Sequence, residues 1–160
     1  MKDLNDFSKF LTDEELAKVA PMLERLSTLD KRTEKHDNFM SFVNHVWPQF
    51  IEGRHHKIYA QKLQDVADGK LKRLIINMPP RHTKSEFASY LFPTWLMGRR
   101  PDLKIIQATH TAELAVGFGR KIKNLIESED FKDVFPDVSL AGDAKASGRW
   151  STNKGGEDYA

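Results

Sequence analysis

The pattern of apolar and polar positions predicts helices over the first 69 residues or so of the chain. An S/T-x-x-E capping box, Thr12 with Glu15, opens the first of them. The apolar residues behind it recur at the spacing of one helix face: Leu16, Val19, Ala20, Leu23 and Leu26. Pro21 falls inside this run, and we expect it to kink or split the helix.

Two further helices are predicted to complete this helical lead-in. One covers about residues 36–45 and ends before Trp47-Pro48, because the residue before a proline disfavours helical geometry. The other follows the sequence GRHH at 53–56 and ends at Gly69, which stands where helices commonly place a glycine just past their last turn.

The pattern then changes to strands that alternate with helices. Residues 71–78 form a short apolar run rich in β-branched side chains and predict a buried strand, and residues 103–109 predict a second one. Helices are predicted over residues 85–97, bent by Pro93, and over residues 111–126. Strand–helix–strand–helix favours the α/β fold class with a parallel sheet, so we divide the chain into a helical lead-in, 1–69, and an α/β part, 70–160.

The composition restricts the class of protein. The chain has 160 residues, 39% hydrophobic and 30% charged, with a net charge of +2, which fits a soluble globular protein and excludes collagen-like or broadly disordered classes. The absence of cysteine excludes disulfides, thiolate nucleophiles and thiolate metal sites. No apolar run approaches the roughly 18 residues that span a bilayer, and the acidic N-terminus lacks the apolar core of a secretory signal, so no membrane partner is expected.

A phosphate-binding pattern lies between the first predicted strand and the helix that follows it. Residues 78–86 read MPPRHTKSE, so Lys84-Ser85 match the end of G-x-x-x-x-G-K-[ST], with Met78 and Thr83 in place of the glycines. Backbone N–H groups at the start of a helix attract anions. Lys84 could then reach the β- and γ-phosphates of ATP, Ser85 could ligate Mg²⁺, and Arg81 adds a planar cation. A Lys-Ser pair that merely opens a helix is the competing structural interpretation.

Several stretches of the chain resemble one known family. NMPPRHTKSE at 77–86 is similar to the glycine-poor Walker A loop of the large terminase subunits of tailed bacteriophages. Four more blocks resemble that family in the same order: WPQF with GRHH at 47–56, FPTWLMGRRP at 92–101, ATHTAELA at 108–115, and GRWST at 148–152 with Gly155-Gly156. The resemblance covers about residues 40–160 and implies a P-loop ATPase of the RecA-like type.

The resemblance also implies cofactors, site residues and partners. Large terminase subunits are ATPase motors that move viral DNA into a preformed capsid, and they carry a separate nuclease. ATP and Mg²⁺ are the implied cofactors, with Lys84 and Arg81 acting in catalysis, Ser85 holding Mg²⁺, and His55 and His56 on the adenine side. The implied cofactor-binding loop is Pro80, Arg81, His82, Thr83, Lys84, Ser85 and Glu86. Residues 109–111 resemble the segment that couples nucleotide state to DNA contact.

Double-stranded DNA, the portal protein, the small terminase subunit and further copies in a ring are the implied partners. The implied location is the cytoplasm of an infected bacterial host, docked transiently on the procapsid.

One part of the family's chemistry has no match in the chain. The apolar strand that ends in paired acidic residues, which holds Mg²⁺ and orients the attacking water, is missing, because Glu157-Asp158 follow Lys154-Gly155-Gly156 instead. The nuclease domain is absent too. We therefore expect an N-terminal fragment or truncated reading frame that is inactive alone and whose first strand lacks neighbours. Two alternatives stay open, a helicase-like DNA ATPase and a catalytically silent remnant that binds nucleotide or DNA.

Some candidate residues have ordinary structural interpretations that we prefer. Trp47 and Trp95 are expected in the core rather than as base-stacking platforms. The basic positions of the helix over 111–126 are expected to form a solvated face: Arg120, Lys121 and Lys123. Adjacent histidines cannot share one helix face, so at most one of His55 and His56 should matter.

Overall fold

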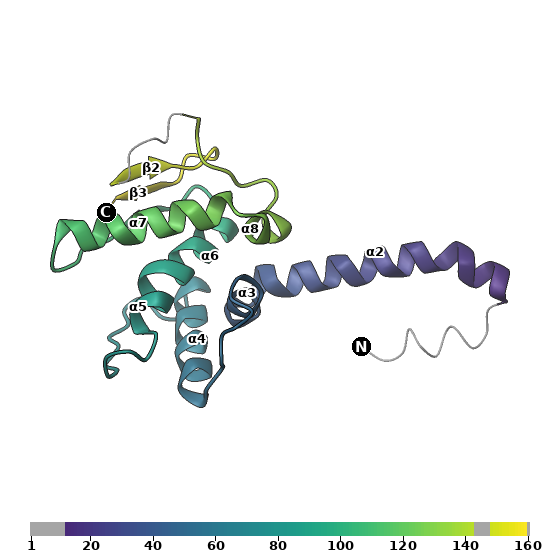
Figure 1. Ribbon diagram of the computed structural model, residues 1–160, viewed down its shortest axis with the longest axis horizontal. Coiled ribbons are helices and arrows are strands. Elements are labelled where there is room, and N and C mark those ends of the chain that lie inside the picture. Colours follow the sequence, from purple (N-terminus) through teal and green to yellow (C-terminus); the bar gives the residue numbers. More distant parts are fainter. Residues whose placement is uncertain (1–11, 143–147, 160) are drawn as a thin grey trace. The chain divides into compact units, whose positions relative to one another are not determined.

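The computed structural model describes residues 12–142 and 148–159 (Figure 1). It has a mixed α/β fold in which helices come first along the chain and the sheet is completed last. The chain divides into two compact units between Thr33 and Glu34. The acidic stretch at residues 1–6 and the side chain of Glu15, the predicted capping partner of Thr12, lie outside the description.

The first helix, α2, is a single element over Asp13–Asp37, with Pro21 inside it. Of the kink or split expected at Pro21, the split is therefore wrong, although proline has no N–H to donate within the helix. The helix also continues past residue 36, where a second helix was expected to begin. The break falls instead at Asn38, whose side chain accepts a hydrogen bond from the Ser41 N–H and caps the next helix.

The next two helices confirm most of the remaining lead-in. Helix α3 covers Phe39–Val46 and ends before Trp47-Pro48, as predicted. Helix α4 covers Arg54–Ala67, and Gly69 follows it with φ +74°, the left-handed conformation expected just past a helix end.

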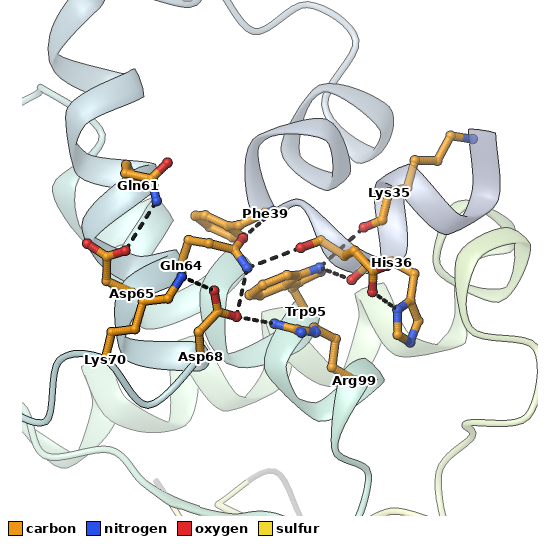
Figure 2. A network of polar contacts seen from close by, with 11 residues as sticks. Lys35, His36, Phe39, Gln61, Gln64, Asp65, Asp68, Lys70, Trp95 and Arg99 are labelled. Carbon is orange, nitrogen blue, oxygen red and sulfur yellow. Dashed lines mark hydrogen bonds and ion pairs between the residues drawn. The ribbon is translucent and has the colours of Figure 1, made fainter. Parts of the chain in front are cut away.

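Trp95 ties the end of α2 to the later helices (Figure 2). Its indole N–H donates to the carbonyls of Lys35, at 3.3 Å, and His36, at 3.0 Å, and its ring is fully buried. The ring of Phe39 lies 5.3 Å away, and the Arg99 guanidinium sits 4.8 Å above the indole. The expectation that Trp95 belongs to the core is confirmed.

Gln64 on α4 makes the second set of these contacts (Figure 2). Its side-chain oxygen accepts from the Phe39 N–H at 3.0 Å, and its amide nitrogen donates to the Asp37 carbonyl and to Asp68, both at 3.1 Å. Asp68 in turn accepts from Arg99 at 3.2 Å. One side chain therefore joins the end of α2, the start of α3 and the end of α4.

A continuous helical run follows the phosphate-binding pattern. It consists of α5 (Lys84–Glu86), the π-helix η2 (Phe87–Leu91) and α6 (Phe92–Arg99). Pro93, which was expected to bend this helix, has no N–H to donate, and the π-helical turn comes directly before it, with the Phe92 N–H donating to the Phe87 carbonyl. The helical prediction for residues 85–97 is confirmed.

The sheet is small and mixed rather than parallel. Its strands are β1 (Lys104–Ile106), β2 (Arg149–Ser151) and β3 (Glu157–Tyr159), in the order β1-β3-β2. Strand β3 pairs parallel with β1 and antiparallel with β2. The strand expected over 103–109 is thus confirmed in its centre, whereas β2 and β3 were not predicted.

Residues 71–78 do not form the strand that was predicted there. Burial alternates over residues 74–78, with Leu74, Ile76 and Met78 half-buried against the core and Ile75 88% exposed. No strand in the described part of the chain pairs with it. The local pattern of a strand is present, but a ladder needs a neighbouring strand, and β1 bonds to β3 instead.

Helix α7 covers Ala112–Glu127, close to the predicted range, and the unpredicted α8 covers Glu129–Val134. The core that joins these elements is rich in aromatic rings, which supply much of the buried apolar area: Phe39, Phe42, Phe87, Phe92, Trp95, Phe131, Phe135 and Trp150. No helix in the described residues is long and apolar enough to cross a membrane.

Candidate phosphate-binding site

The loop at residues 78–86 has an unusual backbone. Arg81, with φ +64°, and Thr83, with φ +58°, are the two non-glycine residues of the described chain in the left-handed region. Each such residue costs about 1–3 kcal/mol and persists where its surroundings hold it. Thr83 stands at the second glycine position of the nucleotide-binding pattern, so the chain adopts there the conformation that a glycine would favour.

The loop leads into a helix start with open N–H groups. Thr83 precedes the helical run, but its hydroxyl donates to the His82 carbonyl at 2.7 Å and caps nothing. Among the described residues, no acceptor bonds to the amides of Lys84, Ser85 and Glu86. Free N–H groups at the start of a helical run attract anions.

The side chains at this helix start are positively charged and exposed. Neither Arg81 nor Lys84 has a carboxylate partner in the part of the chain that the structure describes. Glu86, the acidic residue of the loop, forms a 2.8 Å ion pair with Lys121 on α7. Because Glu86 is neutralised, the loop presents uncompensated positive charge at its surface.

The two adjacent histidines behave differently. His55 is exposed and its ring lies 5.8 Å from that of His82, so the start of α4 meets the loop. His56 is buried and its Nδ1 accepts a 2.9 Å hydrogen bond from the Gly53 N–H. Burial, and then the neighbouring His55, lowers the pKa of His56. Of the two predicted adenine-side residues, His55 is therefore the one with an accessible ring.

Sequence reasoning missed Tyr59, although it touches the loop directly. Its hydroxyl donates to the Lys84 carbonyl at 2.9 Å, and its buried ring stacks on Phe87 with centroids 5.4 Å apart. One signal was available: Tyr59 follows His56 by three positions and therefore lies on the same face of α4.

A mostly apolar groove of about 290 Å³ opens beside the loop. One wall is α4, with His55, Ile58 and Tyr59, and the other is formed by residues 74–78. Because Met78 belongs to the loop and the His55 ring lies 5.8 Å from that of His82, the groove adjoins the loop.

The side chains offer limited ligands for Mg²⁺. The Ser85 hydroxyl is exposed and makes no hydrogen bond to another described residue, so it can give one oxygen ligand. Glu86 is engaged by Lys121, and Asp158 is fully buried, bonded to Gln107 at 3.1 Å, with its pKa raised by burial. No group of three or more His, Asp or Glu suited to a metal occurs in the described residues. An ion beside Ser85 would take its other oxygens from phosphate and water, as Mg²⁺ commonly does.

The structure also places three other residues singled out in the sequence, Thr109, Thr111 and Lys121. Thr109 lines a second groove of about 310 Å³ together with Ala88, Ser89 and Phe92 of the helical run after the loop, and Thr111 caps α7. Lys121 is exposed, as expected, and it also pairs with Glu86 and lies over the ring of Tyr90 at 5.6 Å.

Comparison with known proteins adds no relative: no family model matches the chain, and neither a curated protein nor a solved structure matches it.

Proposed function

We propose that this chain binds the polyphosphate of ATP at residues 78–86 and that it acts as part of a viral DNA-packaging ATPase of the large terminase type. The observation that carries the proposal is the loop itself. A left-handed Thr83, open amides at Lys84 to Glu86 and the unpaired cations Arg81 and Lys84 converge on one exposed helix start.

The charge arrangement favours a polyphosphate over a single carboxylate. Lys84 supplies a point charge, Arg81 a planar fork that can contact two oxygens, and the amides add directed N–H donors. A ligand with several anionic oxygens can use all three at once. Ser85 would contribute its hydroxyl to the Mg²⁺ that accompanies such a ligand.

The groove between α4 and residues 74–78 supports a nucleotide rather than pyrophosphate alone. It is mostly apolar, it adjoins the loop, and His55 offers an exposed aromatic ring at its edge. A flat base could lie against these apolar walls while the phosphates occupy the loop.

Motor activity and the partners of packaging rest on the resemblance of residues 40–160 to terminases. Glu86 on α5 is paired with Lys121, and Asp158 on β3 is buried and bonded to Gln107, so neither carboxylate is free to orient an attacking water. Binding without turnover is therefore the expected behaviour of the chain alone, and this same observation favours the catalytically silent nucleotide binder as the second candidate. Hydrolysis that double-stranded DNA stimulates would favour the motor.

The test is calorimetric titration of the whole chain with Mg-ATP, with parallel titrations of Lys84→Ala and Arg81→Ala. Loss of a charged hydrogen bond costs about 1.5–3 kcal/mol, so Lys84→Ala should weaken binding roughly 10-fold or more. Lys154→Ala, an exposed lysine in the turn between β2 and β3, is the matched control and should bind like the parent chain. Equal affinities for the Lys84 and Lys154 variants would refute the assignment.

A further inference from the structure

Tyr59 connects α4 to the first turn of the helical run that follows the loop, at Lys84 and at Phe87. Its hydroxyl donates to the carbonyl of Lys84, and its ring stacks on Phe87, three residues further along, at an interplanar angle of 22°. The side chain is 5% exposed. Burial raises the pKa of Tyr59 to about 12, so the hydroxyl keeps its proton and remains a hydrogen-bond donor throughout the physiological pH range.

The other polar contacts of the loop backbone are local. The His82 ring bonds the Pro80 carbonyl at 2.9 Å, and the Thr83 hydroxyl bonds the His82 carbonyl. Contacts within a loop cannot by themselves hold it against the rest of the fold. A left-handed threonine needs such an external hold, because without one it relaxes to a cheaper conformation. Among the described residues, Tyr59 is the buried side chain outside the loop that bonds its backbone.

We propose that Tyr59 is a positioning residue, which fixes the Lys84 backbone and thereby holds the loop in its anion-binding conformation. The part of this proposal that concerns ATP rests on the function proposed above. The Lys84 side chain is exposed, and its reach toward a phosphate depends on where the main chain holds its Cα. The Tyr59 hydroxyl bonds the same residue whose ammonium group would contact the ligand.

Tyr59→Phe separates this role from simple packing. Phenylalanine keeps the ring, its volume and its stack on Phe87, and it removes the hydrogen bond to Lys84. Tyr90→Phe is the matched control, because Tyr90 is a second tyrosine near the loop, half-buried on η2, and its hydroxyl bonds no other described residue.

The first measurement uses the whole chain without nucleotide. Amide hydrogen exchange is followed at Phe87, whose N–H bonds the Thr83 carbonyl at 3.0 Å, and at Ile122 in the core as an internal reference. A net hydrogen bond is worth about a factor of 2–10, so exchange at Phe87 should accelerate by roughly that factor in Tyr59→Phe. Exchange at Ile122 and in Tyr90→Phe should not change.

The second measurement is the Kd for Mg-ATP and for pyrophosphate. Both should rise roughly 3- to 10-fold in Tyr59→Phe and stay unchanged in Tyr90→Phe. Unchanged exchange at Phe87, or equal acceleration at Phe87 and Ile122, would overturn the positioning role. If the parent chain binds no ATP, the proposed function fails, whereas faster exchange confined to Phe87 still supports the hold of Tyr59 on the loop.

Discussion

The main-chain N–H of Gly53 donates a hydrogen bond to Nδ1 of His56, 2.9 Å away, across the first turn of α4. The bond fixes the proton of the neutral ring on Nε2, which is buried without a partner in the described structure. The ring lies among Phe50, at 4.8 Å, Phe87 and His55, and the charged groups that act on it are Glu52, His55 and His82. A proton on Nδ1 would break this bond and bury a charge among aromatic rings.

Stability should therefore fall as the solution becomes acidic. Burial, followed by His55, lowers the folded-state pKa of His56, so the unfolded chain takes up a proton near pH 6.5 at which the folded chain does not. The contribution of His56 is complete above about pH 7 and shrinks as the pH drops below 6.5. Urea unfolding between pH 5.5 and 7.5 measures it. His56→Gln should flatten the slope, while the exposed His110→Gln should retain it; identical slopes would contradict the assignment.

The loop backbone predicts opposite effects for two substitutions at Thr83. Glycine adopts φ +58° without steric cost, so Thr83→Gly should fold normally and keep its affinity for ATP. Proline is confined to φ near −65° and cannot adopt this conformation, so Thr83→Pro should lose binding by at least about 10-fold. Calorimetry with Mg-ATP on both variants decides the matter, and comparable binding by the two would show that the left-handed conformation is not required.

Two helix glycines give a matched test of packing. A Cβ at Gly98 on α6 would stand 2.5 Å from ring atoms of Phe135, so Gly98→Ala should destabilise the fold by about 1–3 kcal/mol. A Cβ at Gly117 on α7 would meet nothing within 4 Å, so Gly117→Ala should stabilise it by about 0.5–1 kcal/mol, because alanine has the better helix propensity. Urea unfolding of both variants measures the difference, and a stabilised Gly98→Ala would disprove the close contact.

Two glutamines on α4 test the network in Figure 2. Gln64 bonds the Phe39 N–H and the Asp37 carbonyl, which belong to other helices, so Gln64→Ala should cost about 2 kcal/mol of unfolding free energy. Gln61 bonds Asp65 on the same exposed helix face at 3.2 Å, so Gln61→Ala should cost under about 0.5 kcal/mol. Equal losses in chemical denaturation would mean that the interhelical bonds contribute little.

The helices could be predicted where a cap and the apolar spacing agree. Helix α7 begins directly after Thr111, whose side chain accepts from the Leu114 N–H, and it ends within a residue of the predicted boundary. The end of α2 could not be found in this way, because the helix is held by Trp95, whose indole bonds Lys35 and His36 from about 60 positions away.

Strands β2 and β3 could not be predicted, because they too depend on contacts between distant parts of the chain. Strands β2 and β3 have three residues each and carry charges where a buried run was sought. Glu157 on β3 forms ion pairs with Arg149 on β2 at 3.2 Å and with Lys104 on β1 at 3.1 Å, and Trp150 on β2 is buried. Residues 71–78 show the reverse case, since the local pattern of a strand is present and the hydrogen-bonding neighbour is not.

The residues of the candidate phosphate-binding loop could be proposed from the sequence, whereas the contact of Tyr59 with the loop backbone could not. Lys84 and Ser85 match the spacing of a phosphate-binding pattern, Arg81 was predicted as a second cation in the same loop, and the left-handed Thr83 agrees with the glycine that the pattern expects. Tyr59 comes 25 positions before Lys84, and a local motif carries no information about a contact across that separation.

The most direct test of the phosphate-binding loop is an NMR titration that follows its backbone amides. We predict that the amide signals of Lys84, Ser85 and Glu86 shift saturably with Mg-ATP and with pyrophosphate, and stay in place with adenosine alone. Amides elsewhere, such as Gly117 on α7, should serve as the unmoved reference. Shifts with adenosine equal to those with Mg-ATP, or no shift at Lys84 to Glu86 at saturating Mg-ATP, would contradict the account.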